Sequence, residues 1–145
     1  MNNEFLKIIR PIVKHSNYKK MKSIIHHKKT SAYKHSIKVA YLSYKFYKKH
    51  EPNIDLSCLI KGALLHDYYL YDWHIKEKFH KFHGYKHPKI AYNNAIKDFK
   101  DLSNLEKDII THHMFPLTIM PPKSKEAWIV CWCDKLAAIS DYIKG

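Results

Sequence analysis

Helical periodicity is the feature that most constrains how this chain folds. Apolar residues recur every three or four positions along nearly every segment, which is typical of amphipathic helices packed in a bundle. The 145 residues include only 3 Gly and 6 Pro, too few turn-forming residues for a many-stranded barrel or sandwich. No repeat, low-complexity tract or Gly/Ser linker divides the chain. We therefore expect an all-α bundle of about six helices, in one domain spanning residues 1–145.

Capping residues and prolines indicate where these helices begin and end. An N-terminal helical segment is expected over about residues 3–29, broken at Pro11 and again near Ser16-Asn17, and packed on the rest of the domain. Residues 71–86 and 114–123 are expected to be irregular. The later helices are expected after Thr30-Ser31, from Asp55, over 89–99 with Pro88 in the first turn, after the Ser103-x-x-Glu106 capping box, and after Ser124.

Cysteine content and hydropathy predict a cytoplasmic protein. Cys58, Cys131 and Cys133 are an odd number, which fits a reducing compartment rather than a disulfide framework. The longest uninterrupted apolar stretch, 127–133, is too short to span a bilayer, and residues 1–15 lack the apolar core of a signal peptide. We expect no membrane partner.

The net charge of +13 predicts anionic partners. Arg10 is the only arginine, and arginine is the main side chain that reads guanine, so we do not expect sequence-specific binding of nucleic acid. Non-specific contact between lysines and phosphates stays open, as does homo-oligomerisation. A small phosphorylated substrate is the partner that we expect.

Several histidines and aspartates interrupt apolar helix faces and would point into the bundle. Such polar groups are costly to bury unless they are paired or bound. A metal ion would satisfy all of them at once, because imidazole nitrogen and carboxylate oxygen suit Mn, Fe, Co, Ni and Zn. These residues are His35, His66, Asp67, His112, His113 and Asp134.

In order and context, these residues resemble the H…HD…D signature of the HD-domain metal-dependent phosphohydrolases. His35 lies in TSAYKHSIKVA, the HD pair lies in LLHD, and Asp134 lies in CDKLA. The segments HGYKHPKIA and IITHHMFP match too, the latter resembling the His-His element of members that hold two metals. The resemblance covers about residues 30–143 and is closest to short, stand-alone bacterial HD proteins.

The resemblance implies one or two divalent transition-metal ions among Mn, Fe, Co, Ni and Zn. It assigns the first ion to His35, His66, Asp67 and Asp134. It assigns the second ion to His87, His112 and His113, with Asp67 bridging the two and positioning a hydroxide that attacks phosphorus.

Residues around the expected site are assigned from their positions alone. Lys38, Asp72, His83 and Lys86 are candidate substrate contacts, and we expect His26 and His27 to be solvated. Asp141 has two open interpretations, a carboxylate that orients a ligand or a plain surface residue. No proton donor to the leaving group follows from the motif, because the Lys that often follows the HD pair is missing, and the GYP stretch of the cyclic-dinucleotide branch is missing as well.

The sequence therefore predicts a phosphohydrolase, a phosphomonoesterase or phosphodiesterase that acts on a nucleotide or other small phosphate ester. Two alternatives stay open. One is a non-catalytic, metal-stabilised module that binds nucleic acid or has a regulatory role. The other is a di-iron oxygenase on the same scaffold.

Overall fold

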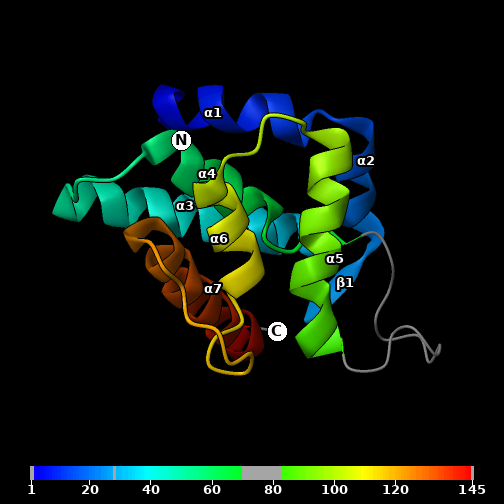
Figure 1. Ribbon diagram of the computed structural model, residues 1–145. Helices are drawn as coiled ribbons and strands as arrows, with labels where there is room; N and C mark the ends of the chain where they lie inside the picture. The colour runs from blue at the N-terminus through cyan, green and yellow to red at the C-terminus, as the bar shows by residue number, and fades with distance from the viewer. Residues whose placement is uncertain (1, 28, 70–82, 145) are drawn as a thin grey trace.

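A computed structural model describes residues 2–27, 29–69 and 83–144 of the chain, with no description of the side chains of 27, 83–85 and 144. Across these residues the fold is mostly helical, which confirms the all-α prediction (Figure 1). The elements are α1 (Asn3–Val13), α2 (Ser16–Lys19), the 3-10 helix η1 (Lys20–Ser23), β1 (Ile25–His27), β2 (Thr30–Ser31), α3 (Ala32–His50), α4 (Leu56–Leu65), α5 (His83–Asp98), α6 (Asn104–His112) and α7 (Lys125–Lys144).

Helices α3 and α4 pack against each other at the centre of the bundle. Helix α7 packs on α3, and α6 packs on both α4 and α7 (Figure 1). Helix α1 lies across α4, while α5 contacts α6. The core between these elements is built from fully buried apolar side chains, among them Phe5, Met21, Val39, Leu59, Leu64, Ile109, Ile110 and Val130.

Side-chain caps begin most of these helices where the sequence predicts them. The Ser31 hydroxyl accepts a hydrogen bond from the backbone N–H of Lys34 at the start of α3. The Asp55 carboxylate does the same for α4. Ser103 caps α6 and Ser124 caps α7 in the same manner. These capping residues therefore begin the central helices where the sequence predicts.

The N-terminal segment is not helical throughout, contrary to the expectation for residues 3–29. Helix α1 continues through Pro11, which removes one helical hydrogen bond, and ends two residues later at Val13. After η1, strands β1 and β2 pair as a two-stranded antiparallel hairpin. The N–H of Ala32 donates to the carbonyl of Ile24 at 2.7 Å, which joins this hairpin to the start of α3.

Helix α5 starts at His83, six residues before the predicted Lys89. Pro88 therefore lies inside the helix rather than in its first turn. The residue before Pro88, His87, is helical and buried instead of lying at a helix edge. This extension brings His87 toward the interior of the bundle.

No helix within the described ranges combines the length and the apolar character that crossing a bilayer requires. Helix α7 is the longest, at 20 residues, and it carries charged groups along its length.

Gly62 lies where α4 packs tightly against α6. A Cβ placed on Gly62 would lie 2.5–2.9 Å from three atoms of the buried Ile109, including its Cβ. Gly→Ala inside a helix normally stabilises a protein by about 0.5–1 kcal/mol. We expect Gly62→Ala to lower the free energy of unfolding instead, by about 1–3 kcal/mol, because the two helices must separate. Urea denaturation measures this change, and an increase in stability would contradict the close packing.

Candidate metal centre

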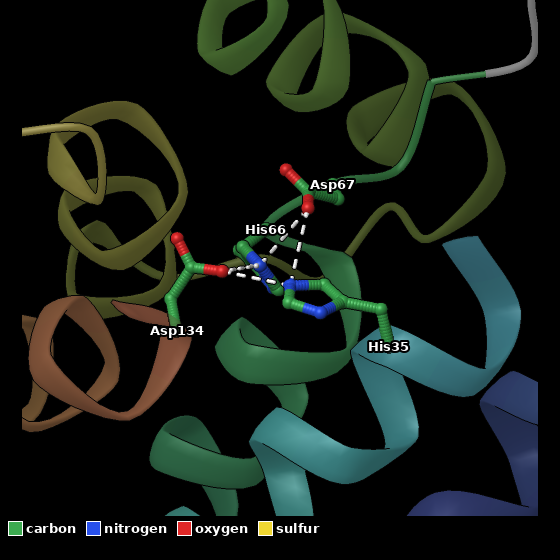
Figure 2. A group of neighbouring side chains, drawn as sticks. All are labelled: His35, His66, Asp67 and Asp134. Carbon is green, nitrogen blue, oxygen red and sulfur yellow. Dashed lines mark hydrogen bonds and ion pairs between the residues drawn. The ribbon is translucent and has the colours of Figure 1, made fainter. Parts of the chain in front are cut away.

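Four side chains from three helices meet at the centre of the bundle (Figure 2). His35 comes from the first turns of α3, and Asp134 from the middle of α7. His66 is the C-cap residue of α4, and Asp67 follows it directly. Figure 2 shows these side chains pointing toward one another, and all four residues are buried.

The ligand atoms of this group are close enough to share one ion. Oδ1 of Asp134 lies 2.8 Å from Nε2 of His35 and 3.1 Å from Nε2 of His66. Oδ2 of Asp67 lies 3.2 Å from Nε2 of His66 and 3.7 Å from Nε2 of His35. One ligand atom from each residue lies within 4.8 Å of all the others. We call these four residues the first ligand group.

Outer hydrogen bonds orient two of these rings. The Nδ1–H of His66 donates to the carbonyl of Ala63, and the Nδ1–H of His35 donates to Oδ2 of Asp141 at 3.2 Å. Carbonyl and carboxylate oxygens only accept, so the proton is on Nδ1 in each ring and Nε2 faces the centre. Metal-binding histidines are held in this way. Of the two interpretations of Asp141, the structure therefore favours the carboxylate that orients a ligand.

A second group shares Asp67 with the first. Oδ1 of Asp67 lies 3.0 Å from Nε2 of His87 on α5 and 3.2 Å from Nε2 of His113 at the end of α6. The two Nε2 atoms are 2.8 Å apart. The Nδ1–H of His113 donates to the carbonyl of Ile110, so its Nε2 also faces inward. We call Asp67, His87 and His113 the second ligand group.

Charge in the two groups is strongly coupled. Burial opposes ionisation of Asp67, but the rings of His66, His26 and His87 outweigh it and hold the pKa of this carboxyl well below its usual range. Burial likewise opposes ionisation of Asp134, yet His66 and His35 hold its pKa well below the usual range. Both aspartates are therefore carboxylates at neutral pH.

The histidines divide into two kinds. Burial opposes protonation of His66, but Asp67 and Asp134 outweigh it and raise the pKa of this ring well above its usual value. Burial opposes protonation of His35 too, and hydrogen bonds to Asp134 and Asp141 raise its pKa. Burial lowers the pKa of His113 despite Asp67. The first group thus holds a strong negative potential that either protons or a cation must balance.

The donor set fits a transition-metal ion better than it fits hydrogen bonding alone. Oδ1 of Asp67 is fully buried and has no hydrogen-bond partner among the described residues, although two ring nitrogens lie within 3.2 Å. Carboxylate oxygens and imidazole nitrogens that converge on one point suit a divalent cation. The two groups could hold one or two such ions.

His112, expected to serve the second ion, lies outside both groups. Its Nδ1 contacts Oδ1 of Asp108 at 2.6 Å, one helical turn back on α6. Asp108 also accepts hydrogen bonds from the N–H groups of Lys123 and Ser124, the two residues just before α7. Neighbouring residues on a helix point about 100° apart, so His113 can face the site only if His112 does not. The structure places His112 in a contact that joins α6 to α7.

The four candidate substrate contacts fall in different places. The ammonium group of Lys38 bonds Asp141 at 3.0 Å and the hydroxyl of Ser140 at 2.9 Å, beside the first ligand group. Lys86 is exposed on α5. Asp72 and the side chain of His83 lie outside the described residues.

The sequence did not predict that His26 lies at the site, because its basic neighbours indicated a solvated segment. His26 on β1 is only 8 % exposed, and its Nε2 lies 2.8 Å from Oδ2 of Asp67. Its ring also stacks on His35, with centroids 3.9 Å apart. The four basic residues at 26–29 pointed to a charged surface, and a three-residue strand is too short for its periodicity to show which side chain is buried.

Residues 32–139 match the family model of the HD domain. That span holds every residue of the first ligand group and extends over most of the chain. The chain belongs to the HD-domain family. Comparisons with curated proteins and with solved structures gave no match. In this HD domain the histidine and aspartate cluster is intact and buried.

Proposed function

We propose that this HD domain is a metal-dependent phosphohydrolase that acts on a nucleotide or another small phosphate ester. The observation that carries the proposal is the division of the Asp67 carboxylate between two ligand groups. Oδ1 faces His87 and His113, and Oδ2 faces His35 and His66. A carboxylate shared in this way suits a pair of neighbouring ions, an arrangement that supports phosphoryl transfer.

Ions bound there would supply Lewis-acid stabilisation of phosphoryl oxygens and lower the pKa of a water molecule into the neutral range. The chain's own residues provide the frame for this chemistry. Two divalent ions less the charges of Asp67 and Asp134 leave a positive centre, which would attract an anionic ester. Asp141 holds the ring of His35 with its Nδ1 turned outward, so that Nε2 faces the first ligand group and could coordinate an ion. Buried surroundings strengthen these electrostatic contacts relative to water.

The basic surface supports an anionic substrate. The net charge of +13 favours encounter with phosphorylated molecules at low ionic strength. Lys38 lies beside the site and bonds the carboxylate that orients His35. We propose that it reinforces this orientation rather than reaching a phosphate.

The test combines metal analysis with a phosphate-release assay. The chain is stripped with a chelator and reloaded separately with Mn, Fe, Co, Ni or Zn, and phosphate release is measured over a panel of nucleoside phosphates, cyclic nucleotides and simple esters. We expect release only from reloaded protein, with up to two ions bound per chain. A chain that holds both ions and hydrolyses no ester in the panel would instead favour the non-catalytic module.

A further inference from the structure

We propose that His26 is a positioning residue that fixes the orientation of the Asp67 carboxylate between the two ligand groups. The proposal rests on the metal-centred function above. It goes beyond that function because His26 belongs to neither ligand group and comes from the N-terminal hairpin, outside the matched residues 32–139.

The hairpin directs His26 into the bundle through an irregularity in its pairing. Ile25 pairs with Ser31 and His27 pairs with Thr30, so two steps along β1 match one step along β2. His26 is the additional residue in this bulge. Bulges change the direction of side chains and often occur next to functional sites. The hairpin also packs on α3 and α7, the helices that carry His35 and Asp134.

Two contacts hold His26 at the site. Its Nε2 is 2.8 Å from Oδ2 of Asp67, the shortest distance from a ring nitrogen to either oxygen of that carboxylate among the described residues. Its ring lies nearly parallel to that of His35, at 13° and a centroid distance of 3.9 Å. The stack keeps the imidazole edge, and therefore Nε2, facing Asp67.

A bridging carboxylate depends on its rotation more than other ligands do. Asp67 serves the second group through Oδ1 and the first group through Oδ2. Rotation of the carboxylate plane would withdraw both oxygens together. At 2.8 Å the Nε2–H of His26 is placed to donate to Oδ2 and so to oppose that rotation, while Oδ1 stays with His87 and His113. His26 thus acts on both ion sites through one oxygen atom.

Two substitutions separate the hydrogen bond from the ring stack. His26→Gln keeps an N–H donor at about the reach of Nε2 but loses the aromatic ring. His26→Phe keeps a ring that can stack on His35 but loses the donor. His50→Phe is the matched control, since His50 is exposed near the end of α3 and away from both ligand groups.

The main measurement is calorimetric titration of Mn²⁺, and separately Zn²⁺, into chelator-stripped protein. We expect His26→Phe to weaken ion binding by about 10- to 100-fold, the usual loss when a residue that orients a ligand is removed. His26→Gln is expected to stay within about threefold of wild type. Circular dichroism and melting of the stripped proteins show whether each variant folds.

Activity adds a second measurement once a substrate is found. We expect His26→Phe to lower kcat more than it raises KM, because the residue acts through Asp67 and not on the substrate. A folded His26→Phe variant with wild-type affinity for both ions would overturn the proposal, and so would equal losses in the Phe and Gln variants. Ion affinity tests His26 even in a chain that hydrolyses nothing, whereas phosphate release tests the proposed function.

Discussion

Asp67→Asn is expected to disrupt both ion sites at once and to abolish phosphate release. The carboxylate serves one ligand group through each oxygen, and the neutral amide removes the negative charge that attracts the ions. Removing one partner of a buried charged contact costs about 3–5 kcal/mol, which corresponds to a fall in ion affinity of roughly 10²- to 10⁴-fold. Elemental analysis and the phosphate assay measure the two effects.

The matched control for this variant is Asp101→Asn. Asp101 is an exposed carboxylate between α5 and α6 and belongs to neither ligand group. It should keep the wild-type ion content and activity. If Asp67→Asn kept two ions per chain, the shared carboxylate would not be a ligand and the proposed function would lose its main support.

His113→Ala is expected to reduce the metal content from two ions to one, while His112→Ala leaves it unchanged. The two histidines are adjacent in sequence, but only His113 directs a nitrogen at Asp67. His112 instead contacts Asp108, and losing that contact should lower the free energy of unfolding by about 1 kcal/mol. We expect activity to fall at least about 100-fold in His113→Ala, because one side of the site is lost.

This pair of variants separates metal binding from stability. Each protein is analysed for bound metal and unfolded by urea after chelator treatment. Equal metal loss in both variants would show that His112 also binds an ion when the protein is loaded. A normal metal content in His113→Ala would indicate a site with one ion.

Local signals in the sequence were sufficient to predict where most of the central helices begin. Caps such as Ser31 and Asp55 act on backbone groups three residues away, so their effect is readable without the rest of the fold. The first ligand group was readable as well, since each of its members interrupts an apolar helix face. The structure brings these residues together as the sequence led us to expect.

Features set by tertiary contacts could not be predicted from the sequence in the same way. Periodicity identifies the pair His112-His113. Neighbouring helical residues point only about 100° apart, so periodicity does not show which of the two imidazoles faces the site. Pro88 indicated a helix start, yet α5, which packs on α6, begins at His83. The position of His26 depends on an irregularity in the pairing of β1 with β2, and these short strands contact η1 and α3.

The candidate ligands are far apart along the chain. His35 and Asp134 are separated by 99 positions, yet their side chains approach to 2.8 Å. An ion held between them would act as a cross-link that closes this long loop. Closing a 100-residue loop with a covalent bond stabilises a fold by about 4.7 kcal/mol in the chain-entropy model, and a tightly held ion acts in the same direction. Heat resistance of the protein would then follow the supply of metal in its surroundings.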